Sequence, residues 1–559
     1  MRHPRKHLLI GLFLLSLLLH VSGQPALQSQ SGNVTALIRS IAAAGRWNDL
    51  RWPNFSDYRS DVSRFYQPSY APAWLDKGQP TSEALAIIQV LQQAEQEGLN
   101  SEDYDGSRWD ERVRTLQGQG TPEAEANFDA ALTVSVMRYV SDLRIGRVNP
   151  RHLDFDYDVG PKKLDLPNFV RERLVTASDP KNALAEVEPP FAGYKATRAA
   201  LRRYIQLSRQ QEAEKLPTLE VPVLLPGARS DAMPRLVRFL KLVGDLPEDS
   251  PITGEDQVYS DAIVAAVKQF QNRHDLPGNG WISRETVDQM NTPLSARVEQ
   301  LQLSLERWRW LPLKYAEPPI VVNLPEFYLR VVAAQGKIVL RMHVNVGDSY
   351  EHQTPVFEKM MTYLVFRPYW DMPMSIQKKE FVDAIAKDRS FVEQNNFEVV
   401  DRVGRVVPGG KISDTELQGL RSGTLRLRQK PGPLNALGLV KFIFPNDHSV
   451  YLHDNPEDVD LFSESRGDVS HGCIHVGQPA ELAAWVLRGD PKWTLERVEN
   501  AMHEGKDNLR VNLPKPIPVL IVYATAVVEE DGLVYFTPDL YGHDARLKAA
   551  LAKGYPYPW

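Results

Sequence analysis

The sequence predicts a multidomain α+β protein with a helical scaffold domain, a small three-helix domain and a β-rich domain that carries a capping insertion. Three observations predict this fold class. Apolar residues recur with helical spacing up to about residue 216, a proline-containing stretch follows, and the apolar period changes to two beyond Pro318. A chain of 559 residues has room for three or four domains.

The first segment, residues 1–23, has the pattern of a secretory signal. Three basic residues precede an apolar run over residues 8–19. That run would span only about 18 Å as a helix, against roughly 30 Å for a hydrocarbon core. We expect cleavage near Gly23, with an uncleaved membrane anchor as the alternative. No later segment is apolar and long enough to cross a bilayer.

Residues 24–216 are expected to form the mostly helical scaffold domain. In "TSEALAIIQVLQQAEQEGLN", four apolar residues share one helical face, Thr81 or Ser82 is placed to cap the helix, and Gly98 is placed to end it. A second helical pattern, "DAALTVSVMRYVSDLRIGRVNP", ends at Gly146. Both stripes indicate core packing rather than chemistry.

Residues 223–291 follow a proline-containing linker and predict three short helices around one core. Two amphipathic stretches precede a glycine turn in "HDLPGNGWISRETVDQM", where Ser283 is placed to cap the last helix. An insert, "DLPEDSPITGEDQ", interrupts the segment.

Residues 318–525 alternate apolar and polar side chains and predict the β-rich domain. "KIVLRMHVNVG" has a hairpin partner in "EFYLRVVAAQGK", and further strands are predicted at "MMTYLVFRPYW", "LVKFIFP" and "SVYLHD". Residues 375–433 are charged and helix-like, which predicts an insertion over the sheet. "PIPVLIVYATAVVEEDGLVYF" predicts another hairpin, and residues 526–559 a C-terminal strand and helix extension.

Composition excludes some classes of function. A net charge of -6 gives no overall attraction to nucleic acid, and 24% charged residues are typical of a soluble globular protein. Cys473 is the only cysteine, so an exported chain keeps a thiol that has no disulfide partner within the chain.

The segment "DVSHGCIHV" predicts a nucleophile at Cys473. A cysteine attacks as its thiolate, which needs a base or a cluster of donors. His453, at the end of a predicted strand, is the candidate general base because a rigid element delivers its ring from a separate position. The backbone amides of His471, Gly472 and Cys473 can form a nest for an oxyanion.

These residues resemble a known family. "HD" at His453 followed by "SHGC" resembles the L,D-transpeptidase catalytic (YkuD-type) domain, and "RPYWDMPMSI", "RQKPGPLNALGLVKFIFPN" and "LYGHD" extend the resemblance to the YcbB-type subgroup. "AVKQFQ" in residues 223–291 resembles the peptidoglycan-binding domain type 1 family. The resemblance covers nearly all of the mature chain.

The resemblance implies a role for each matching residue. Cys473 would be the nucleophile and His453 the base, Asp454 would orient that base through its carbonyl, and His471, Gly472 and Cys473 would form the oxyanion hole. Trp370 and Tyr451 match substrate-side positions, although core packing is an equal alternative for both. The subgroup has arginine where His475 stands, so carboxylate binding would fall to protonated His475 or to Arg466.

The reaction implied is 3→3 cross-linking of diaminopimelate through a cysteine thioester on tetrapeptide stems, with release of D-alanine. The expected partners are peptidoglycan stem peptides and glycan, and other cell-wall synthesis enzymes. We expect a periplasmic location, acylation by carbapenems, and no cofactor or metal. Three alternatives stay open: hydrolysis by the same cysteine as an L,D-carboxypeptidase, a non-catalytic wall-binding protein, and a metal site built from the histidines and the cysteine.

Overall fold

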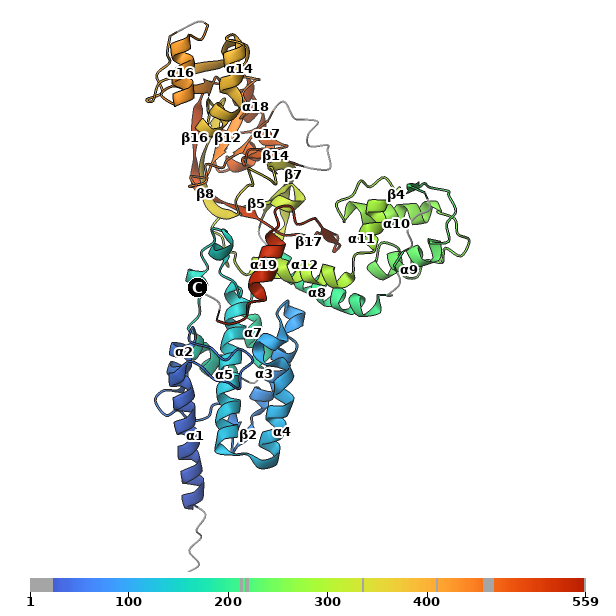
Figure 1. The fold of residues 1–559 in the computed structure, drawn as a ribbon, viewed down its shortest axis with the longest axis vertical. Coiled ribbons are helices and arrows are strands. Elements are labelled where there is room, and N and C mark those ends of the chain that lie inside the picture. The colour runs from blue at the N-terminus through green and yellow to red at the C-terminus, as the bar shows by residue number, and fades with distance from the viewer. Residues whose placement is uncertain are drawn as a thin grey trace, which may run out of the picture.

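The computed structural model describes residues 24–177, 179–211, 215–216, 221–333, 336–408, 411–455 and 467–556. The predicted signal segment and Arg466 lie outside the described residues and stay predictions. Figure 1 shows three bodies: a helical region, a lobe carried on a helical arm, and a β-rich domain that ends in a small helical subdomain. Within the described part of the chain, no helix has the length and apolar character needed to cross a membrane.

The helical region is built around α5, Pro122–Ile145, which is buried along most of its length. The other α-helices of this region are α1 (Gln24–Ala44), α2 (Arg59–Tyr66), α3 (Ser82–Gln92), α4 (Trp109–Gln119), α6 (Leu166–Val170) and α7 (Pro180–Ala185), with a short hairpin of β1 (Leu75–Asp76) and β2 (Gln79–Pro80). Thr81 caps α3 by accepting from the Ala84 amide, and Gly98 adopts the left-handed conformation after the next turn. The predicted helical N-terminal region is confirmed.

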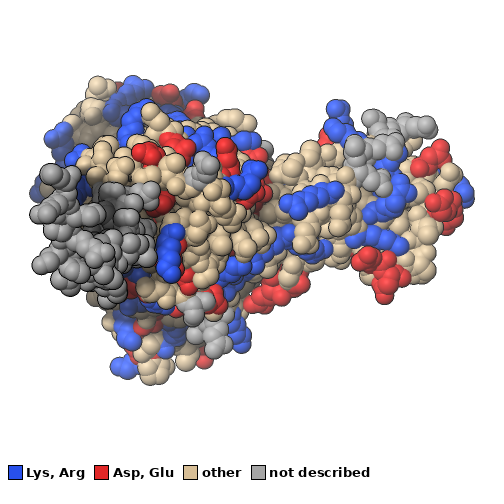
Figure 2. Space-filling model, turned by 90° about the horizontal axis from the view of Figure 1, so that it is seen from below, with Lys and Arg blue, Asp and Glu red and all other residues tan. Residues whose placement is uncertain are grey.

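The arm consists of two helices that pack along each other, α8 (Ala192–Gln210) and α12 (Leu294–Trp308). Its lobe contains α9 (Met233–Val243), α10 (Asp261–Asn272), α11 (Arg284–Met290) and the pair β3 (Val223–Leu224) and β4 (Ile282–Ser283). The three helices share a core with the arm and with Phe536 of the C-terminal segment. Figure 2 shows basic and acidic side chains interspersed over the face seen from below.

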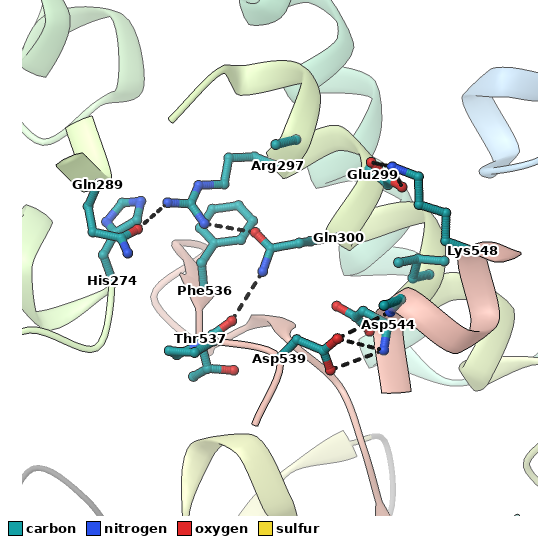
Figure 3. A pocket seen from close by; sticks show the side chains of 14 residues that line it. His274, Gln289, Arg297, Glu299, Gln300, Phe536, Thr537, Asp539, Asp544 and Lys548 are labelled. Carbon is teal, nitrogen blue, oxygen red and sulfur yellow. Dashed lines mark hydrogen bonds and ion pairs between the residues drawn. The ribbon is translucent and has the colours of Figure 1, made fainter. Parts of the chain in front are cut away.

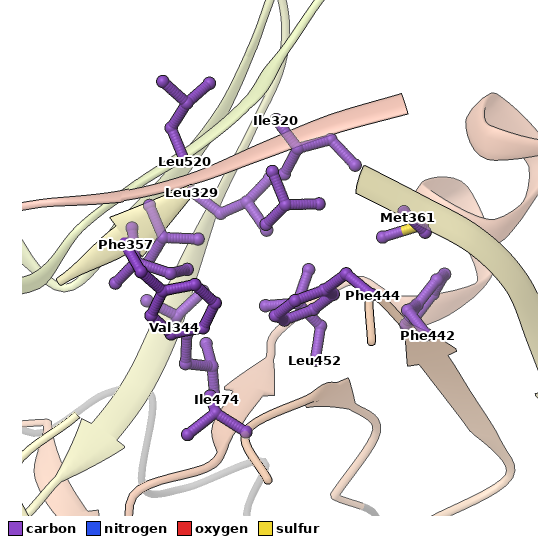
Figure 4. Packing of buried hydrophobic residues seen from close by; sticks show 14 of the residues in the cluster. Ile320, Leu329, Val344, Phe357, Met361, Phe442, Phe444, Leu452, Ile474 and Leu520 are labelled. Carbon is purple, nitrogen blue, oxygen red and sulfur yellow. The ribbon is translucent and has the colours of Figure 1, made fainter. Parts of the chain in front are cut away.

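The β-rich domain is a nine-stranded sheet in the order β14-β7-β15-β13-β12-β8-β16-β5-β6, and β6 also pairs with β7, so the sheet closes on itself. The strands are β5 (Ile320–Asn323), β6 (Tyr328–Val332), β7 (Ile338–Gly347), β8 (Phe357–Phe366), β12 (Val440–Ile443), β13 (Leu452–His453), β14 (Asp468–Ser470), β15 (Ile474–Val476) and β16 (Leu509–Val522). Their alternate side chains fill the core seen in Figure 4, and α17 (Pro479–Val486) and α18 (Leu495–His503) pack against it. The large β-sheet predicted for this region is confirmed.

The insertion between β8 and β12 differs from the helix-like segment that its charge predicted. It contains a three-stranded sheet of β10 (Phe397–Val400), β11 (Arg426–Gln429) and β9 (Trp370–Asp371). Its helices are α13 (Met374–Ile376), α14 (Val382–Lys387), α15 (Phe391–Gln394) and α16 (Asp414–Ser422), with a π-helical turn at Gln377–Phe381. The two longer strands have only four residues each, too few for a clear alternating pattern.

The C-terminal segment also corrects one prediction. "PIPVLIVYATAVVEEDGLVYF" does not form one hairpin, because its first part belongs to β16 of the large sheet. The hairpin is formed by β17 (Ala526–Val528) and β18 (Val534–Phe536), and it packs against the arm. α19 (His543–Leu551) follows, and the chain then returns to the helical region.

Candidate active site

Cys473 lies in a tight loop between β14 and β15 that is fixed by hydroxyl groups. The Ser470 hydroxyl donates to the Cys473 carbonyl at 2.5 Å and accepts from the Gly472 amide at 3.1 Å. Thr354 Oγ1 donates to the Gly472 carbonyl at 2.9 Å. Gly472 has a φ of 102°, where other residues would be strained. The loop therefore needs glycine at this position to present the thiol.

Strand register brings His453 to the same face of the sheet as Cys473. His453 on β13 pairs with His475 on β15 and with Lys441 on β12. Side chains in register point to the same face, and successive residues alternate. Ile474 enters the core, so His475 and Cys473 on either side of it face outward together with His453. The imidazole is thus carried by β13 and the thiol by the loop that precedes β15.

A backbone hydrogen bond orients the His453 ring. His453 Nδ1 donates to the Asp454 carbonyl at 2.8 Å, because a carbonyl oxygen can only accept. This leaves the Nε2 lone pair as the basic position. The ring is 3% exposed and lies 4.7 Å from the His475 ring, centroid to centroid. Burial, then the neighbouring His475 and Lys441, hold the pKa of His453 well below its usual range. His453 is neutral at neutral pH.

Asp454 also anchors the base through its side chain. Its Oδ2 accepts from the Leu439 amide at 2.7 Å. Gly438 approaches so closely that a Cβ there would lie 2.5 Å from the Asp454 carboxyl group. Burial raises the pKa of Asp454. Asp454 therefore ties the start of β12 to the end of β13, the strand that carries the candidate base.

Burial dominates the electrostatic environment of the thiol. Cys473 is partly exposed, with Sγ 3.8 Å from the Ser449 carbonyl oxygen. Burial raises the pKa of Cys473, and the Tyr451 amide and the Lys441 ammonium oppose this only in part. The resting thiol is therefore protonated at neutral pH, and the base must take its proton during attack.

Lys441 is a site residue that the sequence analysis missed. Its Nζ lies 3.7 Å from the centroid of the Tyr451 ring, and its charge acts on Cys473. Burial lowers the pKa of Lys441, against the attraction of Cys473 and Asp371. A lysine inside the otherwise apolar strand "LVKFIFP" was the available signal, but only the pairing of β12 with β13 places it beside the base.

The oxyanion nest is partly occupied. The Gly472 amide already donates to Ser470 Oγ, so it is not the open donor that was expected. The amides of His471 and Cys473 remain as candidate donors. The His471 side chain faces the insertion, where its Nε2 lies 2.9 Å from Glu380 Oε1. Its ring also lies 4.8 Å from that of His352.

The candidate substrate-side residues are only partly brought together. Tyr451 lies beside the thiol and beneath Lys441. Trp370 instead packs against Phe381 and Phe397 in the insertion. Burial and His471 lower the pKa of His475 to about 4, so His475 is neutral at neutral pH and offers no positive charge to a carboxylate.

Among the described residues, no group of three or more histidine, cysteine or acidic side chains is arranged to hold a metal ion.

Comparison with protein families matches two parts of the chain. A model described as "Scaffold domain" matches residues 60–201, within the helical region. A model described as "L,D-transpeptidase catalytic domain" matches residues 318–496, which include every strand of the large sheet except β16, the insertion and the Cys473 loop. Comparison with curated proteins gives no match. The chain therefore contains an L,D-transpeptidase catalytic domain at residues 318–496, the domain of an L,D-transpeptidase-type enzyme of the cell wall.

Proposed function

We propose that the protein is a periplasmic peptidoglycan L,D-transpeptidase that forms 3→3 diaminopimelate cross-links through a thioester on Cys473. The observation that carries this proposal is the placement of Cys473 and His453 on one face of the sheet, with His453 Nδ1 held by the Asp454 carbonyl at 2.8 Å. The free Nε2 then accepts the thiol proton during attack.

In the first half-reaction, Cys473 Sγ attacks the carbonyl carbon of the amide between the L-centre of diaminopimelate and the terminal D-alanine. The thiol proton passes to His453, and the carbonyl oxygen becomes an oxyanion near the amides of His471 and Cys473. When the C–N bond breaks, His453 returns the proton to the leaving nitrogen. D-Alanine departs, and the stem tripeptide remains as a thioester.

In the second half-reaction, the side-chain amine of a second stem's diaminopimelate attacks the thioester carbonyl. His453 takes the proton that this amine loses and gives it to the sulfur as the C–S bond breaks. The products are a cross-linked dimer and a regenerated thiol. The insertion, held over the Cys473 loop by the contact of Glu380 with His471, supports this proposal because excluding water favours an amine acceptor.

The test is incubation of the purified protein with disaccharide tetrapeptide, followed by mass spectrometry of the products and of the intact protein. We expect a cross-linked dimer, free D-alanine and a transient protein adduct. Cys473→Ala should abolish all three, while Ser449→Ala, beside the thiol, should keep them. A tripeptide without dimer would identify a hydrolase, and no turnover in any condition would identify a binding protein.

A further inference from the structure

A cavity of about 320 Å³ lies between the arm and the C-terminal segment, and it shares no lining residue with the Cys473 site. Its walls come from α12, from α11 and His274 of the lobe, and from the C-terminal chain from the end of β18 into α19 (Figure 3). None of the residue roles described above accounts for this cavity.

Arg297 on α12 is a buried cation at the cavity whose hydrogen-bond partners are neutral. Its side chain donates to Gln300 Oε1 at 2.8 Å and to Gln289 Oε1 at 2.5 Å, and its guanidinium lies 4.9 Å from the centroid of the Phe536 ring. Arg297 is 7% exposed. Within the described ranges, no aspartate or glutamate forms an ion pair with it.

Other buried arginines nearby are compensated. Arg273 pairs with Asp245, and Arg307 pairs with Asp544. A buried charge without a counterion is costly, which is why such charges are normally paired. Burial, with the repulsion of Arg273 opposing the attraction of Tyr204, lowers the pKa of Arg297 to about 10. The side chain stays charged at neutral pH and lacks an anion.

Two further polar atoms at the cavity can form hydrogen bonds with a ligand. Thr537 is 8% exposed, and its Oγ1 is buried and has no hydrogen-bond partner among the described residues. His274 donates from Nδ1 to the Phe270 carbonyl at 2.8 Å, so its Nε2 is an acceptor. Burial, with Arg273 and Arg297 nearby, holds the pKa of His274 well below its usual range and keeps the ring neutral. The cavity thus offers a cation, a hydroxyl and an acceptor.

The remaining charges restrict the ligand. Glu299 pairs with Lys548 at 2.7 Å, so these two largely cancel. Asp539 accepts from the Tyr523 hydroxyl at 2.6 Å and from the Asp544 amide at 3.0 Å, and it places a carboxylate on the opposite wall (Figure 3). A multiply charged anion such as phosphate would be repelled by Asp539. A ligand with one carboxylate and a nearby N–H group could form hydrogen bonds with both walls.

We propose that this cavity binds a small ligand of the amino-acid class, with its carboxylate on Arg297 and Thr537 and its N–H group toward His274 and Asp539. The ligand is either a free amino acid or the C-terminal residue of a peptide, since both have this chemistry. Bound there, it would join α12 to the segment between β18 and α19, and so couple the lobe to the β-rich domain.

The test is calorimetric titration of the full chain with D-alanine, D-alanyl-D-alanine and inorganic phosphate as separate probes. We expect at least one of the first two to bind and phosphate to bind more weakly. Arg297→Gln should weaken binding roughly 10-fold or more, because a charge-assisted hydrogen bond to the carboxylate is lost. Preference for the dipeptide would identify a peptide end, and preference for D-alanine a free amino acid.

The matched control is Arg284→Gln on α11, which removes the same charge from a side chain that is 87% exposed. It should leave binding unchanged, and Thr537→Val should weaken binding several-fold. Thermal unfolding of Arg297→Gln should occur no earlier than in the wild type, because the variant removes an uncompensated buried charge. Equal binding by Arg297→Gln, stronger binding of phosphate, or no binding of either amino-acid probe would overturn the proposal. No turnover is measured, so the result is independent of the proposed catalytic function.

Discussion

At the residue scale, the pair of Cys473 and His453 is built as a neutral thiol beside a neutral imidazole. Burial raises the pKa of Cys473 and lowers the pKa of His453, so both shifts oppose a resting thiolate–imidazolium pair. Proton transfer must therefore accompany attack on the substrate rather than precede it. Lys441, whose charge favours the thiolate, is placed to reduce the cost of this transfer.

This electrostatic arrangement predicts the pH dependence of acylation. The reactive form needs His453 neutral, so the rate falls only when pH drops below the lowered pKa of His453, which lies well under 6.5. On the alkaline side, the raised pKa of Cys473 keeps the thiol protonated through neutral pH. Acylation rates measured by intact mass should be flat across neutral pH. An inflection near pH 7 to 8 would instead show that the thiol titrates in this range and reacts as its thiolate.

Replacement of each histidine separates their roles. His453→Ala should slow acylation about 10²–10⁴-fold, the usual contribution of a general base, and its residual rate should rise with pH as thiolate forms. His475→Ala is the matched control, because His475 lies on the same face but its Nδ1 accepts from Asn455 Nδ2 at 3.0 Å, so its neutral ring carries the proton on Nε2 and offers no lone pair there. A larger loss of the acylation rate in His475→Ala than in His453→Ala would show that His453 is not the general base.

The sequence singled out candidate site residues but did not predict their charge states. The short segment around Cys473 and the strand-borne His453 could be recognised because each signal is local. The sign of the thiol pKa shift and the role of Lys441 could not, because both depend on which strands pair. The parallel pairing of β13 with β15 and the antiparallel pairing of β12 with β13 are long-range contacts without a local pattern.

At the element scale, the insertion contacts the Cys473 loop and its neighbour through one hydrogen bond and one ion pair. Glu380 binds His471 at 2.9 Å, and Lys379 binds Glu351 at 2.9 Å. Both Lys379 and Glu380 belong to the π-helical turn Gln377–Phe381. One turn of the insertion therefore reaches two loops beside the candidate nucleophile, where its position would control the access of water to the proposed thioester.

Removal of one of these contacts should change the fate of the acyl-enzyme. Glu380→Gln removes the carboxylate that contacts His471, an exposed contact of the kind that contributes up to about 1 kcal/mol. We expect the ratio of hydrolysis to transfer to rise up to about fivefold, measured as tripeptide against dimer, and the difference to shrink at high salt. Glu393→Gln, an exposed change on α15 of the same insertion, should leave the ratio unaltered. The same rise in both variants would exclude a specific role for the contact.

The elements that the sequence predicted well have long, regular patterns. β7 alternates over ten residues and α5 continues for 24 residues. The insertion was predicted less well, because its strands are short and its hydrophobic core is assembled from several separate pieces. Charge along residues 375–433 indicated exposure on one side but could not show the three-stranded sheet within.

At the scale of the whole molecule, the C-terminal chain ties the domains together. After α19, Tyr555 enters the core of the helical region, where its hydroxyl donates to Asp142 of α5. Tyr104 donates to the same carboxyl oxygen at 2.7 Å, and the guanidinium groups of Arg138 and Arg147 lie 4.4 and 4.8 Å from the Tyr555 ring centroid. The residues furthest along the described chain thus stabilise a helix near its beginning.

This contact predicts a pH-dependent loss of stability in Tyr555→Phe. Burial raises the pKa of Asp142 from 3.8 to about 7, against the hydrogen bonds of the two tyrosines. The folded state therefore binds this proton more tightly than the unfolded state, and stability falls as pH rises from about 4 to about 7. Above pH 7 the carboxylate depends on its two donors. Loss of one donor should lower the free energy of unfolding by about 1.5–3 kcal/mol above pH 7. At pH 5, where Asp142 is protonated, the loss should be about 0.5–1.5 kcal/mol.

Hydrogen exchange of the α5 amides, measured at pH 5 and pH 8, tests this prediction in the region where the contact acts. After correction for the intrinsic exchange rate, Tyr555→Phe should lower protection more at pH 8 than at pH 5. Tyr535→Phe is the matched control, since Tyr535 donates to Asp531 at 3.2 Å in an exposed hairpin. Tyr535→Phe should leave the protection of the α5 amides unchanged at both pH values. Equal losses at the two pH values would show that the Asp142 carboxylate does not depend on Tyr555, and that packing alone holds the C-terminal chain to the helical region.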